Sequence, residues 1–545
     1  MSEAETPVLI VGGGPVGLAL AADLGWRGIA CTLVEQGDGT IYHPRANTVN
    51  SRTMEFCRRW GVAQEVTNAG APPDFPSTIL YLTSLQGYEL ARIERPTYGG
   101  GDRGRIQKLA TSPERSQRCN QLYFDPIMRQ LAQRMPTVTM RYRCRFEGFE
   151  EKDGFVLATV RDLANDRVEK IAARYLVACC GGQSMVRNAL GVHMDGEMVL
   201  SYHLNVFLRT KELWNRHDKG KAAFYFFVNK VGNNPSLIEL DGDELWRLGI
   251  NLGLERVAPE AVDVAGIINA VIGPGIECEV KSVLPWTQRS IVADRWRRGP
   301  VMLAGDAVHQ HGPSGGFGMN TGLGDAVDLG WKLAATLEGW GGAALLDSYE
   351  RERRPVAKRV VDEVREHQDE IFDEATLAAI DRPGPEGDAL RKRVGDEIVR
   401  RRTRVYISDG IALGYRYDPS PIVVSDGTPP PRDSVTEYVQ TSRPGSRAPH
   451  AWLGGGRSTV DLFGRGFVLL AFGGAAREAQ GLEAAARSRG MKLTVTPIDD
   501  PATASLYERR LVLVRPDGHV AWRADAAPKD PLAIVDTVRG AGANS

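Results

Sequence analysis

The sequence predicts an α/β protein that combines a Rossmann-type dinucleotide-binding domain with a second, β-sheet domain and a separate C-terminal domain. Three observations predict this architecture. A strand, a glycine-rich turn and a helix follow one another from Val8, strand-like segments succeed each other between residues 199 and 286, and a proline-rich connector at 418–435 precedes a further strand-rich part. Because 545 residues exceed the size of one ordinary domain, we expect two or three separate cores.

Composition and charge exclude several classes of protein. Lys and Arg (67) nearly balance Asp and Glu (68), so the sequence gives no reason to expect a nucleic-acid or acidic-membrane partner. The acidic N-terminus lacks the charged and apolar regions of a signal peptide, and no apolar run has the length of a membrane span. We therefore expect a cytoplasmic protein. Since the seven cysteines lack the spacing of a zinc site, we also expect free thiols and no metal.

The first glycine-rich turn has the form of a phosphate-binding unit. The apolar run Val8–Val11 predicts a buried parallel strand that leads into a helix. Gly12, Gly14 and Gly17 have the G-x-G-x-x-G spacing, in which backbone N–H groups at the helix N-terminus meet a pyrophosphate. Glu35 ends the next strand, about 20 residues further on, where an acid binds ribose hydroxyls. This unit predicts dinucleotide binding but does not distinguish FAD from NAD.

A second glycine-rich turn occurs in the stretch LAGDAVHQHGPSGGFGMNTG, from Leu303 to Gly322. It follows an apolar strand at 301–304, carries Asp306 at the carboxyl end of that strand and precedes a helix expected to begin near Thr321. The carboxylate could accept a hydrogen bond from a sugar-like chain. Glycine lets backbone N–H groups approach a flat or anionic ligand, so we expect the loop to hold the second part of the same dinucleotide. The glycines concerned are Gly315, Gly316 and Gly318.

Together these motifs resemble the single-component class A FAD-dependent aromatic hydroxylases. In that family an Asp, Asp306 here, binds the ribityl chain, and the loop that here contains Pro313 lies beside the isoalloxazine ring. PRANTVNSRTMEFCRRWG is similar to the segment whose Arg, Arg45 here, lies near the flavin. RCNQLYFDPIMRQLA resembles the segment with a flavin-contacting Gln and a following acid, at Gln121 and Asp125. With LLDSYERERRPVA after the second helix, the resemblance spans most of residues 7–360.

The resemblance implies FAD as the cofactor and NAD(P)H as a co-substrate. The residues expected to bind FAD are Gly12, Gly14, Pro15, Gly17, Glu35, Arg45, Gln121, Gly305, Asp306, Pro313, Gly316, Gly318, Met319 and Asn320.

It also implies a division of the chain. Residues 1–192 and 282–372 are expected to form the FAD-binding domain, with part of 60–120 facing the substrate, and 193–281 the substrate-binding sheet. Residues 373–435 are expected to form a helical segment and linker. Residues 436–545 resemble the thioredoxin-like C-terminal domain of phenol and polyketide hydroxylases. Because no cysteine follows Cys278, we expect no dithiol chemistry there and a role in structure or in the contacts of a homodimer.

The implied reaction is hydroxylation of a small phenol- or catechol-like substrate with O2, through a flavin C4a-hydroperoxide. Two alternatives stay open at this point. One is a Baeyer–Villiger or polycyclic (polyketide) monooxygenase on the same scaffold, and the other is a non-catalytic protein that binds flavin or an aromatic ligand.

The candidate catalytic residues are Pro313, near the reacting edge of the flavin in the family, with Arg45, His309 and Tyr225. An imidazole, His309 or His311, could remove a phenolic proton because it titrates near neutral pH, or it could pack beside the flavin or face solvent. The strands between 199 and 286 are expected to form one wall of the aromatic pocket. Candidates for that wall, or alternatively for the core, are Tyr202, Asn205, Tyr225, Phe227 and Trp246.

One position departs from the family pattern. In YLVACCGGQSMVRNALG, Cys180 stands where relatives usually carry Asp, while Ser184 and Arg187 are kept. The segment is associated with flavin and nicotinamide binding, so the lost carboxylate weakens the expectation of nicotinamide docking most. Cys179 and Cys180 could form a redox-active pair, or Cys180 could be an inert, buried small side chain.

Overall fold

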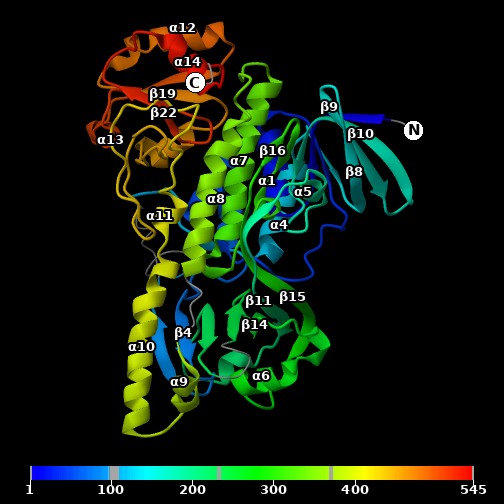
Figure 1. Ribbon diagram of the computed structural model, residues 1–545. Helices are drawn as coiled ribbons and strands as arrows, with labels where there is room; N and C mark the ends of the chain where they lie inside the picture. Colours follow the sequence, from blue (N-terminus) through cyan, green and yellow to red (C-terminus); the bar gives the residue numbers. More distant parts are fainter. Residues whose placement is uncertain (1–2, 96, 98–109, 230–234, 367–371, 543–545) are drawn as a thin grey trace.

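The computed structural model describes residues 3–95, 97, 110–229, 235–366 and 372–542. Within these residues the chain forms two 8-stranded sheets, a 4-stranded sheet and a 2-stranded ribbon. The first sheet lies beside the long helices α7 (Phe317–Leu337) and α8 (Ser348–Glu366), and the second sheet and the C-terminal domain lie at opposite ends of the molecule (Figure 1). The expected α/β class is confirmed.

The first sheet has the parallel core of a dinucleotide-binding fold. Its order is β16-β17-β10-β1-β2-β7, and all of these neighbours are parallel except β16 and β17. The hairpin β8-β9 extends it from β10. The apolar run at Val8–Val11 forms the end of β1 and is buried, as expected. The bounds are β1 (Glu3–Val11), β2 (Cys31–Val34), β7 (Val138–Arg141), β8 (Cys144–Lys152), β9 (Phe155–Asp162), β10 (Arg167–Ala178), β16 (Arg297–Arg298) and β17 (Val301–Leu303).

Three helices cover this sheet next to one another. Helix α1 (Pro15–Arg27) packs against both α4 (Gln121–Gln133) and α7. Helix α7 begins at Phe317, earlier than the expected Thr321, because only Gly315 and Gly316, with φ of 75° and 68°, adopt the left-handed conformation of the preceding loop. Gly318 therefore lies inside the helix rather than in a loop.

The second sheet has one face packed on its own core and one face turned toward the first domain. Its order is β18-β15-β11-β14-β13-β12-β4-β5. Helix α6 (Val264–Ile272) closes a core that contains alternate residues of these strands, among them Leu204, Tyr225 and Leu248. The bounds are β4 (Ile79–Leu82), β5 (Glu89–Ile93), β11 (Met194–Arg209), β12 (Phe224–Phe227), β13 (Ser236–Glu239), β14 (Leu245–Gly253), β15 (Glu279–Ala293) and β18 (His309–Gln310).

The polar helical stretch expected from 347 to about 404 is divided into several helices in the structure. After α8 come α9 (Glu374–Ala379) and α10 (Pro385–Tyr406). Helix α10 packs against β5 and lies beside β4 (Figure 1). Its apolar side chains form one cluster with those of β4. The segment that links the two halves of the chain thus covers one end of the second sheet.

The C-terminal domain has a thioredoxin-like arrangement. Its sheet has the order β20-β19-β21-β22, in which only β20 and β19 are parallel. Helices α12 (Gln480–Ser488) and α14 (Pro531–Val538) pack together, and their apolar side chains share a core with Trp331 of α7 and Trp340. The expected turn at Pro516 joins β21 to β22. The strand bounds are β19 (Phe467–Phe472), β20 (Leu493–Ile498), β21 (Leu511–Val514) and β22 (Val520–Ala524).

A set of fully buried charges joins this domain to α7 and α8. We call Asp328, Lys332, Glu352, Arg515 and Asp517 the interdomain charge cluster. The Arg515 guanidinium donates to Glu352 at 2.5 and 2.9 Å, to Asp328 at 3.2 Å and to Asp517 at 2.7 Å. The Lys332 ammonium lies 2.7 Å from Asp328 and 2.6 Å from Glu352. Every member therefore has at least one partner of opposite charge.

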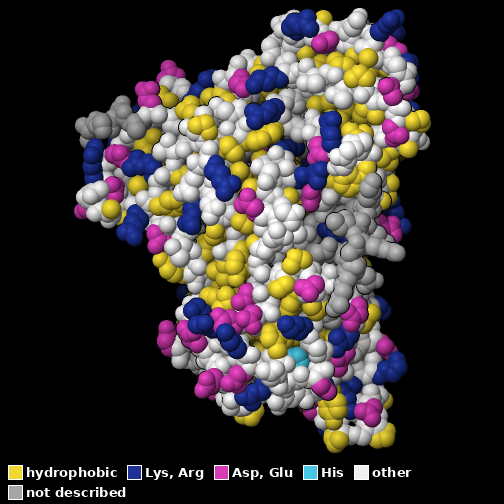
Figure 2. Space-filling view, turned by 180° about the vertical axis from the view of Figure 1, so that it is seen from behind, with side chains coloured by type: hydrophobic (Ala, Val, Ile, Leu, Met, Phe, Trp, Pro, Cys, Tyr) yellow, Lys and Arg dark blue, Asp and Glu magenta, His cyan; other side chains and the backbone are white. Residues whose placement is uncertain are grey.

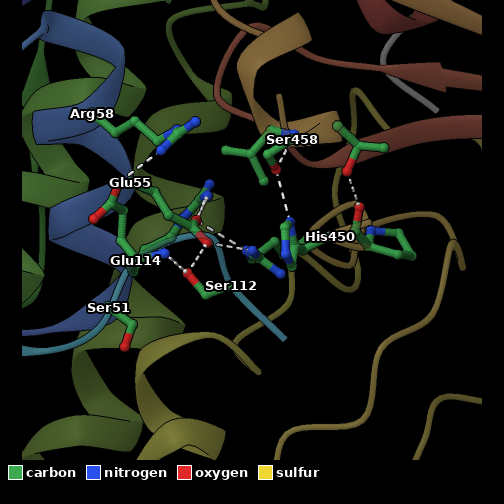
Figure 3. A network of polar contacts seen from close by, with 12 residues as sticks. Ser51, Glu55, Arg58, Ser112, Glu114, His450 and Ser458 are labelled. Carbon is green, nitrogen blue, oxygen red and sulfur yellow. Dashed lines mark hydrogen bonds and ion pairs between the residues drawn. The ribbon is translucent and has the colours of Figure 1, made fainter. Parts of the chain in front are cut away.

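A second buried contact between the domains surrounds Glu55 on α2 (Ser51–Trp60). Its carboxylate accepts hydrogen bonds from Ser112 at 2.7 Å, from Arg52 at 2.7 Å and from Arg447 of the C-terminal part. Figure 3 shows Glu55 and Ser112 on one side of this contact and His450 with Ser458 on the other. Burial alone would raise the pKa of the Glu55 carboxyl, but the two guanidinium groups hold it at about 2.

The outer surface carries charges of both signs. On the face shown in Figure 2, Lys and Arg side chains are interspersed with Asp and Glu, without one large area of a single sign. Among the described residues, no helix combines the length and the apolar character needed to cross a lipid bilayer.

Candidate active site

A cavity of about 2440 Å³ lies between the first and second sheets. Its upper wall comes from the segments that follow the carboxyl ends of β1, β2, β10 and β17, the usual place for a ligand in an open parallel sheet. A site for one small molecule occupies about 300–1,000 Å³. The cavity therefore has room for a large cofactor and a second ligand together.

The N-terminus of α1 opens into this cavity. Gly14 is its N-cap and Pro15 its first residue; no side chain caps the helix and no acid lies in its first turn. A Cβ at Gly14 would meet nothing within 4 Å, so its backbone faces open space. The Glu35 carboxylate accepts hydrogen bonds from Gly13 N–H and Gly37 N–H, both at 2.7 Å, and is thereby fixed at the rim of the same opening. This geometry suits a pyrophosphate next to a ribose.

Close packing explains two of the glycines. A Cβ at Gly12 would lie 2.5 Å from the carbonyl oxygen of Cys179, and one at Gly17 would lie 2.0 Å from the carbonyl oxygen of Gly12. Both distances are impossible for real atoms. Gly17 therefore lets helix and strand approach each other and lies behind the wall, whereas Gly12 and Gly14 line the cavity.

Two carboxylates and one guanidinium meet further inside. The carboxyls of Asp125 and Asp306 line the cavity, and Arg45 lies close enough to lower the pKa of both. Burial outweighs that effect and raises both values, to about 7 for Asp125. Gln121 donates a hydrogen bond to Asp125 Oδ2 at 2.9 Å, but Asp125 Oδ1 is buried without a protein partner. An unused buried acceptor of this kind suits the hydroxyl of a ligand.

The loop before α7 is held from behind by Asn320. Its side chain accepts from Asn50 N–H at 2.9 Å and donates to the carbonyls of Thr48 at 2.9 Å and Gly316 at 2.7 Å. Asn320 and Gly305 lie behind the cavity wall together with Gly17, while all other residues expected to bind FAD line it. Pro313, exposed to the cavity, is among those in the wall.

His309 is fixed by a buried hydrogen bond. Its Nε2 lies 2.9 Å from Asp325 Oδ2, and the same carboxylate accepts from Gly305 N–H at 3.1 Å and from Arg353 at 2.8 Å. Arg353 in turn lies 3.4 Å from the hydroxyl of Tyr417. With 1% of its surface exposed, His309 supports the turn that carries Asp306. This placement supports a structural role in the wall more than the expected catalytic role.

The side chain of His311 is more exposed to the cavity than that of His309. Its Nδ1 lies 2.7 Å from the carbonyl of Gly312, and because a carbonyl only accepts, Nδ1 carries the hydrogen. Burial lowers the pKa of the imidazole to about 4, so the ring is neutral near pH 7. Its Nε2 is then a hydrogen-bond acceptor, is buried without a protein partner and belongs to the cavity wall.

The second sheet supplies an aromatic floor, but not with all the expected residues. On β12 the side chains of Phe224 and Phe226 face the cavity, stacked 6.0 Å apart. Tyr225 is fully buried on the opposite face, where its hydroxyl bonds Gly220 O and Ala222 N–H. This placement does not support a catalytic role for Tyr225, because neighbouring residues of a strand point to opposite faces and Tyr225 points away from the cavity. Trp246 lies in the same core as Tyr225. Of the remaining wall candidates, Tyr202, Asn205 and Phe227 contact the cavity.

Sequence reasoning missed several side chains of the floor. His203 stacks on Trp286 at 4.3 Å, and the hydroxyls of Tyr81 and Tyr406 lie 3.0 Å apart where α10 meets β4. All four line the cavity. The alternation of β11 and β15 is a signal that could have found the first pair. No spacing links Tyr81 to Tyr406, because they are distant in sequence.

The surroundings of Cys180 favour an unreactive thiol. Its thiol donates to Ser184 Oγ at 3.0 Å, and Ser184 caps the short helix α5 (Met185–Ala189). Burial raises the pKa of both Cys179 and Cys180, which favours the thiol form. The geometry supports a small packed side chain rather than a reactive pair.

Comparison with known proteins gives a consistent result over nearly the whole chain. A family model described as FAD binding domain matches residues 5–364, and one described as aromatic-ring hydroxylase, C-terminal, matches residues 441–540. The chain is 32% identical over 571 residues to tetracenomycin A2 monooxygenase-dioxygenase of Streptomyces glaucescens, covering 97% of this chain and 95% of the relative. It is 32% identical over 565 residues to 4-methyl-5-nitrocatechol 5-monooxygenase of a Burkholderia species, covering 98% and 97%.

Solved structures agree with these relatives. RebC with bound 7-carboxy-K252c has a TM-score of 0.91 and 38% identity to this chain, covering 99% of this chain and 100% of the other. A ternary complex of aklavinone-11 hydroxylase with FAD and aklavinone has a TM-score of 0.80 and 29% identity, covering 99% of each chain.

Proposed function

The chain belongs to the FAD-dependent aromatic-ring hydroxylases, and from this we propose that it hydroxylates a phenolic ring with NAD(P)H and O2 as co-substrates. The observation that carries the proposal is the single cavity in which the dinucleotide-type wall of the first sheet faces the aromatic floor of the second.

FAD, the cofactor of the family, fits the residues of the upper wall. We assign its pyrophosphate to the N-terminus of α1 at Gly14 and its adenosine ribose to Glu35. The ribityl chain is assigned to Asp306 and Asp125, whose buried Oδ1 lacks a protein partner. Arg45 and the loop from Pro313 to Gly316 are assigned to the flavin ring.

Bound FAD supplies the redox chemistry, since it accepts a hydride from NAD(P)H and activates O2 for insertion of one oxygen atom. The protein holds the substrate ring within reach and keeps bulk water away. Phe224 and Phe226 offer stacking surfaces for the ring. His311 Nε2, a neutral acceptor, receives the hydrogen bond of the substrate hydroxyl and so makes the ring more electron-rich.

The breadth of the cavity favours a second candidate, a polycyclic aromatic in place of a single-ring phenol. Its volume of about 2440 Å³ is more than a cofactor and one ring require, given about 300–1,000 Å³ per small-molecule site. The relatives include a nitrocatechol enzyme and a tetracenomycin enzyme.

Because NAD(P)H is a cytoplasmic reductant, we place the protein in the cytoplasm. Gel filtration decides between a monomer and a homodimer.

The test is to measure NAD(P)H oxidation, O2 uptake and product together. Substituted phenols, catechols and polycyclic phenols form the panel, and mass spectrometry identifies a product heavier by one oxygen atom. Coupled formation of a ring-hydroxylated product supports the proposal. A lactone or ester product would point to Baeyer–Villiger chemistry, and flavin binding without any stimulated oxidation would point to a binding protein.

A further inference from the structure

Arg247 of β14 is the only charged side chain of β12, β13 and β14 that lines the cavity, within the described part of these strands. On β14, Trp246 and Leu248 point into the core on the outer side, so Arg247 points to the cavity side. The register places it opposite Ile238, which in turn lies opposite Phe224. A guanidinium group therefore lies two strands away from the aromatic floor.

Within the described part of the chain, this guanidinium has no counterion. Nη1 donates to the backbone carbonyl of Arg45 at 3.2 Å, while Nε is buried without a partner. No acidic side chain of the described residues forms an ion pair with Arg247. Burial and the nearby charge of Arg118 lower its pKa to about 10, so it stays protonated near pH 7. Arg118, by contrast, lies 3.6 Å from the carboxylate of Glu239.

Neutral polar groups lie beside it instead of acids. The next position of β14 on the cavity side is Gly249, where a Cβ would lie 2.9 Å from Ser236 Oγ and 3.6 Å from Asn205 Oδ1. Both side chains line the cavity. The register pairs both Asn205 and Ser236 with Gly249, so a hydroxyl and an amide flank the position next to Arg247 on this face, and a side chain at Gly249 would collide with Ser236 Oγ. Such a set can bind a planar anion through several hydrogen bonds.

We propose that Arg247 binds a carboxylate carried by the aromatic substrate, with Ser236 and Asn205 completing the site. A half-buried guanidinium whose Nε is buried without a partner is unfavourable when no described acid neutralises it, and a carboxylate is the planar anion that matches the guanidinium fork. The register then sets the ring system of the same molecule over Ile238 and Phe224. The inference rests on the proposed function, because it concerns the substrate part of the same cavity, and it narrows the substrate class to aromatic acids.

The test compares acids with their neutral amides. FAD-loaded enzyme is titrated with salicylate and salicylamide, and with a hydroxynaphthoate and its amide, and the change in flavin absorbance gives Kd. We expect the acid of at least one pair to bind about tenfold or more tightly than its amide. The variant R247M should abolish this preference, and R247K should keep part of it because charge remains while the fork is lost.

Arg256 provides a matched control. It follows β14 closely, is an exposed member of the same cavity lining and forms no ion pair among the described residues, so R256M removes the same charge at another place in the cavity. The acid preference should survive in R256M. Its loss there would overturn the inference, because either Arg256 or general electrostatic attraction, and not Arg247, would then select acids.

Each other result decides the matter as well. Equal binding of acids and amides, failure of every acid to bind at millimolar concentration, or a preference retained in R247M would overturn the inference. A fall in FAD affinity of R247M with unchanged acid preference would assign Arg247 to the cofactor. Hydroxylation of neutral phenols without acid preference leaves the proposed function intact and removes the inference. Acid-selective binding without oxygenation supports the inference and contradicts the proposed function.

Discussion

The interdomain charge cluster and the cavity both hold charged groups away from bulk solvent, yet only the cluster pairs its charges with one another. Arg515 bonds three carboxylates and Lys332 bonds two of them. In the cavity, Asp125 keeps an unpartnered oxygen, and Arg247 forms no ion pair with any described acid; Arg515 Nε also lacks a partner, but three carboxylates neutralise its guanidinium. Buried polar groups in folded proteins nearly always have partners. The comparison teaches that the paired set serves structure, whereas the unpaired set is shaped for groups that the protein itself does not supply.

Removal of Arg515 is the strongest test of whether the interdomain charge cluster stabilises the fold. In Arg515→Met the carboxylates of Glu352 and Asp328 stay buried with only Lys332 to neutralise them, so the free energy of unfolding should fall by about 3–5 kcal/mol. Urea unfolding of the FAD-loaded protein measures it. As a control, Arg487→Met removes an exposed partner of Glu483 and should cost less than about 1 kcal/mol. Equal losses in both variants would remove the distinction.

Removal of Asp306 is the strongest test of whether the charged groups of the cavity bind a ligand. Asp306→Ala should keep the fold, because this side chain faces the cavity, but should weaken FAD binding about 10- to 100-fold through the loss of a charge-assisted hydrogen bond. Flavin absorbance after gel filtration and a fluorescence titration of the apoprotein measure the loss. Asp243→Ala, which removes an exposed carboxylate elsewhere, should bind FAD normally. A fully yellow Asp306→Ala protein would contradict the assignment.

The contribution of Asp125 to the free energy of unfolding should depend on pH. Burial raises the pKa of its carboxyl to about 7, so the folded apoprotein binds this proton more tightly than the unfolded chain does. The resulting stability is present below the ordinary carboxyl value near pH 4 and is lost as the pH rises through about 7. Between pH 5 and pH 7.5 this contribution should fall by about 2 kcal/mol. In Asp125→Asn the decline should be smaller by that amount. Parallel stability profiles for the two proteins would contradict the prediction.

The smallest effect concerns Tyr225, whose hydroxyl is paired within the sheet. Tyr225→Phe should lower the free energy of unfolding by about 1 kcal/mol and leave turnover of the best substrate unchanged. A large fall in kcat with unchanged stability would return Tyr225 to the reacting groups and would show that paired side chains also take part in the chemistry.

Sequence patterns could predict the upper wall because its geometry is local. A strand, a glycine turn and a helix occur within a few residues at Gly12 and again near Asp306, and both turns lie at the cavity. The floor was harder, since a shift of one residue along β12 exchanges Tyr225 for Phe226. Contacts such as that of Tyr81 with Tyr406 depend on how distant segments meet. The missing counterion of Arg247 has no sequence signal, because it is a property of all the groups around one atom.

The cluster that Arg515 shares with α7 and α8 also bears on recombination between homologous genes. Arg515 and Asp517 lie in the part matched by the C-terminal family model, while Asp328, Lys332 and Glu352 lie in the part matched by the FAD model. A chimaera joined between the two parts inherits three of these five buried charges from one parent and two from the other. Unless both parents carry compatible residues at these positions, the hybrid has unneutralised charge at its seam. The two halves must therefore be exchanged together or re-matched at the cluster.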